Sequence, residues 1–257
     1  MDVEIKPIFQ PTTPLLGTPI YRLGMTSAEN ACKERLAVNQ GGYVCFVNVH
    51  SLTESESNPA LSKTLHDSFL ALPDGLPLVW ASKLNRLPVS ERVCGPDFME
   101  RILRKNPGAT FGFIGGLPEQ AETIGRRFGI KTVSYSPPFR PFSAANALED
   151  WSNFKSIAEK SGTTPRWIWV CLGAPKQELW MNAVATAAPN TLFFGVGAAF
   201  DFLAGNKSRA PVWMQKMGLE WFFRLMQEPK RLFSRYLKTN TRFVYLVIKS
   251  FLFSKNQ

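Results

Sequence analysis

The segment WIWVCLGAPKQELW, residues 167–180, holds the pattern that decides the fold: an apolar run, a turn with glycine and proline, and the start of a helix. The same order recurs along the chain. Apolar runs of strand length stand at 43–49, 111–116 and 191–197, and amphipathic stretches stand at 119–129 and 176–188. Strands that alternate with helices predict an α/β fold, in which helices cover both faces of a Rossmann-like parallel sheet.

The turns after these strands are the first places to expect a ligand, because parallel sheets bind ligands beyond the carboxyl ends of their strands. Gly115 and Gly116 separate a strand from a helix, where glycines let a backbone approach a phosphate. A tight structural turn is the commoner explanation, and the GxGxxG fingerprint of dehydrogenases is absent. Gln177 and Glu178 fall in the first turn of a helix, where they either face a ligand or simply cap the helix.

Three carboxylates and one arginine stand near other turns. Asp74 precedes a glycine in LPDGLPLVW, and taken alone it is more typical of a turn than of a catalyst. RVCGPDFME contains Arg92 and Asp97, and Asp97 is predicted to cap a helix N-terminus. Asp201 follows another glycine-rich strand end. All four side chains are candidates for substrate contact.

No metal site is predicted. The sequence has no DxD motif, its two histidines His50 and His66 are not spaced as ligands, and its four cysteines are far apart, as expected of reduced, buried thiols. The first twenty residues lack the basic start and apolar stretch of a secretory signal. No apolar run reaches the roughly 20 residues that a spanning helix needs, so a cytoplasmic protein is expected.

The net charge of +10 is concentrated near the C-terminus. Residues 1–204 hold 19 Lys and Arg against 18 Asp and Glu, whereas residues 205–257 hold 11 against two. We therefore predict a catalytic α/β domain over 1–205 and a basic helical appendage over 206–257. Such a block indicates an anionic partner, namely nucleic acid, phosphates or a membrane surface, unless it is merely a solvated face.

The appendage has the pattern of a basic amphipathic helix that begins at Pro229, where a missing N–H costs nothing. At about 100° per residue, basic side chains form one stripe and apolar side chains fall opposite. The stripe comprises Arg231, Arg235, Lys238, Arg242 and Lys249, and the apolar side comprises Phe233, Leu237, Val244, Ile248 and Phe251. Such a helix lies on an anionic membrane, or else packs on its own domain or a partner subunit. The apolar stripe disfavours a nucleic-acid partner.

From residue 46 to residue 236 the chain carries, in order, the motifs FVNVHSL, PDGLPLVWA, RVCGPDFM, FGFIGG, LGAPKQELW, GVGAAFDFLAG and RAPVWMQKMGLEWFFRLMQEPKRLFSRY. Together they resemble the WecG/TagA/CpsF family of bacterial glycosyltransferases (glycosyltransferase family 26). Any one motif is modest evidence, whereas the ordered set is highly specific. The resemblance covers the first 40 residues and the tail after Tyr236 weakly or not at all.

This resemblance implies the family's own fold and an inverting transfer from a UDP-sugar, without a metal or cofactor. The transferred sugar is N-acetylmannosamine, glucose or another, and the acceptor is a sugar on polyprenyl diphosphate, in teichoic acid or cell-surface polysaccharide synthesis. Asp74 matches the family's proposed general base. Arg224 and Arg231, with Arg235 at a more variable spacing, match arginines that reach the donor diphosphate. Both residue types suit this chemistry, since a carboxylate accepts a proton and a guanidinium fork binds phosphate oxygens.

Two further matches imply substrate binding, Asn48 and Gln177. Some members have threonine two residues before that asparagine, where this chain has Phe46. The enzyme is expected at the inner face of the cell membrane as a peripheral protein, and a homo-oligomer is compatible with the sequence. The alternative is a non-catalytic module that binds membrane surfaces, as the tail alone predicts. Asp74 separates the two hypotheses, because a binding module has no need of it.

Overall fold

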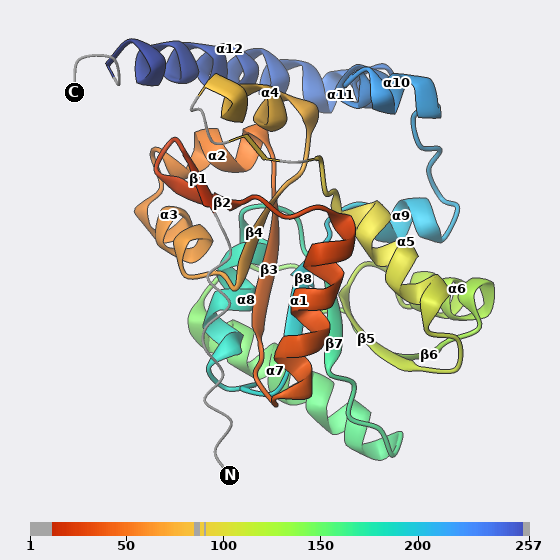
Figure 1. The fold of residues 1–257 in the computed structure, drawn as a ribbon. Helices are drawn as coiled ribbons and strands as arrows, with labels where there is room; N and C mark the ends of the chain where they lie inside the picture. Colours follow the sequence, from red (N-terminus) through yellow and green to blue (C-terminus); the bar gives the residue numbers. More distant parts are fainter. Residues whose placement is uncertain (1–11, 85–87, 90, 254–257) are drawn as a thin grey trace.

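The centre of the protein is a parallel β-sheet (Figure 1). The computed structural model describes residues 12–84, 88–89 and 91–253, without the side chains of Leu84, Arg231, Arg235 and residues 251–253. The strands are β3 (Gly42–Val47), β4 (Leu70–Pro73), β5 (Thr110–Gly115), β6 (Lys131–Tyr135), β7 (Trp167–Cys171) and β8 (Leu192–Gly195). They lie in the order β4-β3-β8-β7-β5-β6, and every neighbouring pair is parallel.

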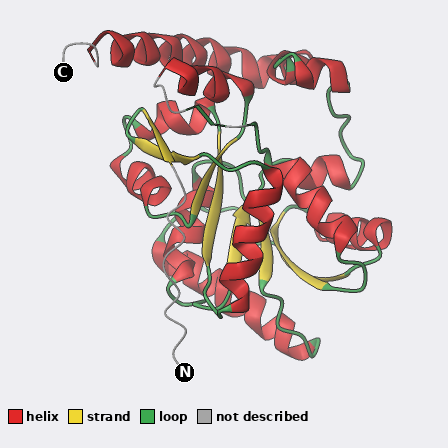
Figure 2. Cartoon of the chain, viewed as in Figure 1, coloured by secondary structure: helices red, strands yellow, loops and turns green. Residues whose placement is uncertain are grey.

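Eight helices cover the two faces of the sheet (Figure 2). One layer contains α2 (Val49–Ser55), α3 (Pro59–His66), α7 (Ala144–Lys160) and α8 (Lys176–Ala185), and the other contains α1 (Met25–Ala37), α5 (Gly95–Lys105), α6 (Pro118–Phe128) and α9 (Ala199–Leu203). Trp151 and Trp180 belong to the core cluster on the first face, and Phe98 and Phe200 belong to the cluster on the second. The predicted Rossmann-like α/β fold is therefore confirmed.

Edge elements were harder to predict than the centre. The four apolar runs became β3, β5, β7 and β8, because strands covered on both faces need near-continuous apolar residues. The sequence did not predict β4, β6 or the hairpin of β1 (Thr12–Leu15) and β2 (Thr18–Tyr21). At the sheet edge β6 reads KTVSY, with only Val133 buried, and it therefore lacks an apolar run.

The C-terminal helices lie on the side of the molecule where the carboxyl ends of the parallel strands are found. They are α10 (Val212–Lys216), α11 (Glu220–Gln227) and α12 (Pro229–Phe253), and α12 begins at Pro229 as the sequence predicted. The helix α2 directly follows the carboxyl end of β3 and packs under α12, with α4 (Leu76–Leu84) beside it (Figure 1). Among the described residues, no helix combines the length and apolarity needed to cross a bilayer.

The helix α12 presents three faces rather than the two that the sequence predicted. Leu232 and Phe243 are buried against the body of the protein. The predicted apolar stripe is a different face and is exposed; its described members are Phe233, Leu237, Val244 and Ile248. The exposed basic residues Lys238, Arg242 and Lys249 form the third face. The domain boundary predicted at residue 205 falls between α9 and α10 and stays a prediction.

Candidate active site

Asp74 lies in the turn between β4 and α4, at the carboxyl edge of the sheet. Its backbone N–H donates to the carbonyl of Val47 on the neighbouring strand, at 2.7 Å. The next residue, Gly75, has a φ of +132°, a conformation that favours glycine. The N–H of Val93 donates to the carbonyl of Pro73 at 2.9 Å, which brings the segment before α5 alongside this turn. Backbone hydrogen bonds thus fix Asp74 between two segments of the chain.

The carboxyl of Asp74 is partly buried and surrounded by charges of both signs. Its pKa is raised to about 7, chiefly because burial disfavours the charged form. The negative charges of Glu220 and Asp97 contribute to this rise, and the positive charges of Arg92 and Arg224 oppose it. A carboxyl that titrates near neutral pH is a far better proton acceptor than an ordinary aspartate. Asp74 therefore has the environment of a general base.

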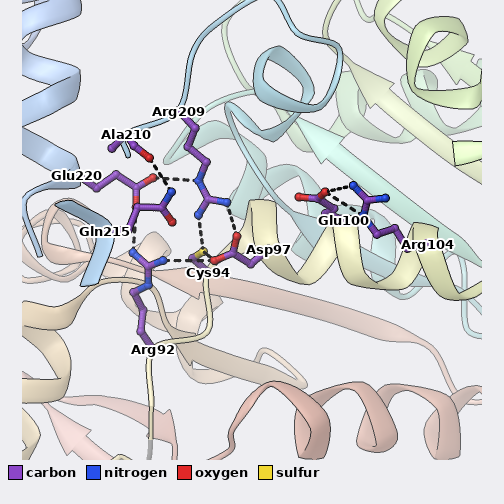
Figure 3. A network of polar contacts seen from close by, with 9 residues as sticks. All are labelled: Arg92, Cys94, Asp97, Glu100, Arg104, Arg209, Ala210, Gln215 and Glu220. Atoms are coloured by element: carbon purple, nitrogen blue, oxygen red, sulfur yellow. Dashed lines mark hydrogen bonds and ion pairs between the residues drawn. The ribbon is translucent and has the colours of Figure 1, made fainter. Parts of the chain in front are cut away.

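Arg92 takes part in a compact network of ion pairs (Figure 3). Its Nη1 donates to Oε2 of Glu220 at 2.9 Å, and its Nη2 donates to Oδ2 of Asp97 at 3.3 Å. Arg209, which precedes α10, donates from Nη1 to Oδ1 of Asp97 and lies 3.5 Å from Oε1 of Glu220 through Nε. Two arginines and two carboxylates, from α5, α11 and two loops, therefore neutralise one another, and each arginine contacts both carboxylates.

The predicted capping role of Asp97 is wrong. The helix α5 begins at Gly95 with Cys94 at its N-cap, so Asp97 falls inside the first turn. Its carboxylate instead accepts hydrogen bonds from both arginines of the network and from Sγ of Cys94, at 2.8 Å. These partners hold the pKa of Asp97 low in spite of its burial. Asp97 is therefore an anchor for arginines rather than a helix cap.

Gly115, Gly116 and Asp201 meet at the carboxyl end of β5. Both glycines have positive φ angles, and a Cβ at Gly115 would lie 2.3 Å from the carbonyl oxygen of Cys171. A tight turn without room for a side chain therefore explains why both positions are glycine. Asp201 Oδ1 accepts from Nε2 of Gln120 at 2.7 Å, and Oδ2 lies 3.3 Å from Nζ of Lys207. The predicted substrate contacts of these three residues remain predictions.

Gln177 and Glu178 are buried beside the carboxyl end of β8. Nε2 of Gln177 donates to the carbonyl of Gly195 at 3.2 Å and to Oε1 of Glu178 at 2.9 Å. Burial raises the pKa of Glu178. In the described part of the chain, Oε1 of Gln177 and Oε2 of Glu178 have no hydrogen-bond partner. Buried polar atoms are rarely left unpaired, so these two oxygens favour a ligand that brings donors to this edge.

The remaining candidates lie on α2, α11 and α12. Asn48 caps α2, with Oδ1 accepting from the N–H of Ser51 at 3.1 Å. Arg224 on α11 lies over the ring of Phe202, 6.0 Å from its centroid, and contributes to the field at Asp74. The side chains of Arg231 and Arg235 on α12 lie outside the described residues, so their predicted phosphate contacts are untested.

The structure thus gathers Asp74, Arg92, Asp97 and Arg224 into one site, and places Asn48, Gln177 and Gly115 on the same carboxyl edge at β3, β8 and β5. Two members of the site were missed by sequence reasoning, Arg209 and Glu220. Glu220 carried one signal, as one of two acids in a strongly basic segment. No group of three or more His, Cys, Asp or Glu that could hold a metal occurs within the described ranges.

The chain is similar to known proteins of one family. A curated relative from Bacillus spizizenii is an N-acetylglucosaminyldiphosphoundecaprenol N-acetyl-β-D-mannosaminyltransferase. It is 29% identical over 201 residues, which cover 75% of this chain and 74% of the relative. The family described as glycosyl transferase WecG/TagA/CpsF matches residues 13–257, which include the whole described sheet and the C-terminal helices. With a match to this family over nearly its full length, the chain belongs to the WecG/TagA/CpsF family of glycosyl transferases.

Proposed function

We propose that this glycosyl transferase moves a sugar from a UDP-sugar to a sugar carried on polyprenyl diphosphate, with inversion at the anomeric carbon. The main support is Asp74, a partly buried carboxyl with a pKa of about 7 at the carboxyl edge of the sheet. Asp74 accepts the proton of the acceptor hydroxyl while that oxygen attacks the anomeric carbon. The bond between this carbon and the diphosphate oxygen breaks, and UDP leaves with the electron pair.

The leaving diphosphate gains negative charge as this bond breaks. Arg92 and Arg224 already act on the charge of Asp74, so they lie within electrostatic reach of the reacting groups. Arg231 and Arg235 follow on α12 and are proposed to add to this field. The terminal nitrogens of Arg92 already bind Glu220 and Asp97, so Arg92 contributes through its charge. The guanidinium groups of the other arginines can bind diphosphate oxygens through paired hydrogen bonds. We therefore propose a transfer that uses these arginines in place of a metal and needs no cofactor.

The name of the Bacillus relative supports one choice of sugars. That protein transfers N-acetylmannosamine to N-acetylglucosaminyl diphosphoundecaprenol. We propose an acceptor of the same class for this chain, in the synthesis of a cell-surface polymer. N-acetylmannosamine is the first donor sugar to test, with glucose as the second.

A lipid-linked acceptor requires the enzyme to reach a membrane, and the C-terminal helices offer a surface for this. The helices α4, α10, α11 and α12 lie on the same side of the molecule (Figure 1), and further exposed aromatic and aliphatic residues belong to α4, α10, α11 and the turn after α10. These are Trp80, Val212, Trp213, Met217, Trp221, Phe222 and Met226. Tryptophan favours the membrane interface, and the neighbouring basic face of α12 attracts anionic headgroups. We propose that this surface docks on the inner face of the cell membrane.

The transfer is tested with a panel of UDP-sugars, a synthetic N-acetylglucosaminyl diphosphate lipid and mass spectrometry of the product. We expect one UDP-sugar to extend the acceptor by one residue, and Asp74→Asn to fold normally and lose this product. Transfer by Asp74→Asn at the wild-type rate would remove Asp74 as the base. Failure of every UDP-sugar on this acceptor would overturn the proposed donor and acceptor classes.

The membrane surface is tested by flotation with vesicles that contain phosphatidylglycerol. Leu237→Glu combined with Ile248→Glu places two charges on the exposed apolar face and should abolish flotation. Ser152→Glu combined with Ser156→Glu adds the same charge to the exposed face of α7 and is the matched control. Equal flotation of the two double variants, or wild-type flotation without anionic lipid, would contradict this surface.

A further inference from the structure

Glu220 is one of only two acidic residues in the basic C-terminal segment of 205–257. The other, Glu228, pairs with Lys207 of the same segment at 2.8 Å. Glu220 differs, because its Oε2 binds Arg92 of the sheet domain at 2.9 Å while its Oε1 faces Arg209. The carboxylate of Glu220, at the start of α11, therefore joins the C-terminal helices to the segment beside Asp74.

Both terminal nitrogens of Arg92 donate hydrogen bonds to carboxylates of the network. Among the described residues, Arg92 donates no hydrogen bond to the carboxyl of Asp74. Nη1 is taken by Glu220 and Nη2 by Asp97, although the Arg92 segment runs beside the turn of Asp74. The side chain of Arg92 is largely buried, at 16% exposure, so its charge needs these partners. An arginine that paired directly with Asp74 would stabilise its carboxylate and weaken it as a base.

Four charged groups act on Asp74 from the surrounding segments. Glu220 and Arg224 come from α11, Arg92 comes from the segment before α5, and Asp97 comes from α5. Glu220 has the largest effect among these charges. The group that most favours the protonated form of Asp74 is therefore contributed by the C-terminal helices and not by the sheet domain.

We propose that Glu220 is a positioning residue for catalysis, which with Asp97 holds both ends of the Arg92 guanidinium in ion pairs beside Asp74 and so keeps this carboxyl a strong base. This proposal rests on the proposed role of Asp74.

The test follows the titration of Asp74 directly, by NMR of protein with ¹³C-labelled aspartate carboxyls, with Asp74→Asn used to assign the resonance. The wild-type midpoint is expected near pH 7. Glu220→Gln should lower it by on the order of one pH unit, the effect of one nearby charge in a partly buried site. Glu228→Gln is the matched control, since it removes the other acid of the segment, and should leave the midpoint unchanged. Asp97→Asn should lower the midpoint as well, by less than Glu220→Gln.

The same variants separate this proposal from a purely structural role. If Glu220 only anchors α11, Glu220→Gln lowers the melting temperature and leaves the Asp74 midpoint in place, which would overturn the proposal. Should Glu220→Gln not fold, Asp97→Asn gives the decision, and an unchanged midpoint there overturns it too. The NMR midpoint needs no substrate, so a failure of the proposed transfer reaction would be seen separately, as loss of product in the UDP-sugar panel.

Discussion

Replacement of Glu29 by glutamine should destabilise the protein in a pH-dependent way. Glu29 lies on α1 with a side chain only 1% exposed, and its carboxylate binds three cations. Arg101 Nε lies at 2.6 Å, Lys33 Nζ at 2.7 Å and Lys105 Nζ at 2.8 Å. Arg101 and Lys105 belong to α5, so this carboxylate joins α1 to α5. Burial by itself would raise its pKa, but the hydrogen bonds outweigh burial and lower the pKa to about 2.

The size of the effect follows from this shift. A fall from the ordinary value of 4.5 to about 2 corresponds to at most about 3.5 kcal/mol of stability. The three cations are 34–48% exposed and therefore screened by solvent, which reduces the expected loss to about 1–2 kcal/mol. Because the folded pKa is depressed, this contribution is complete above pH 4.5 and is lost as the pH falls toward 2.

The assay is urea denaturation followed by circular dichroism at pH 7 and again between pH 5 and pH 3. Glu29→Gln should be less stable than wild type at pH 7, and the difference should shrink below about pH 4.5. Glu122→Gln is the control, because Glu122 meets Arg126 at 3.8 Å with both side chains well exposed, and it should change stability by less than about 0.5 kcal/mol. A Glu29→Gln protein as stable as wild type at pH 7, or a difference that ignores pH, would refute the reasoning.

Three further predictions concern activity and the tail. Wild-type kcat/KM should rise with pH and reach half its maximum near pH 7, since Asp74 must be ionised to accept a proton. Asp74→Asn should lower turnover by on the order of 10²-fold or more at every pH. A flat pH profile of the wild type would exclude Asp74 as the titrating base. Transfer should survive EDTA, and loss that magnesium or manganese restores would show a metal requirement. Truncation after Tyr236 should abolish vesicle binding, and it should lower the melting temperature because it removes the buried Phe243. Arg231→Ala should instead keep vesicle binding and lose turnover. Loss of both properties in Arg231→Ala would contradict separate roles for the two parts of α12.

The central strands, the turn of Asp74 and the start of α12 could be predicted from the sequence. Each depends on neighbours along the chain. Apolar runs followed by glycine mark strands covered on both faces, an aspartate before glycine marks a turn, and Pro229 marks a first helical turn. The family resemblance added the role of Asp74, which its local sequence alone did not indicate.

Only the tertiary structure decided the charge environment of Asp74. Arg92 meets Glu220 across 128 positions of the chain, and Arg209 meets Asp97 across 112. No local pattern encodes such pairs, so Asp97 was taken for a helix cap and Glu220 was missed. The faces of α12 were decided in the same way. Helical periodicity placed its apolar residues, but only packing against the body showed that Phe243 is buried while Leu237 is exposed, because burial depends on which surface meets the helix and not on the helix alone.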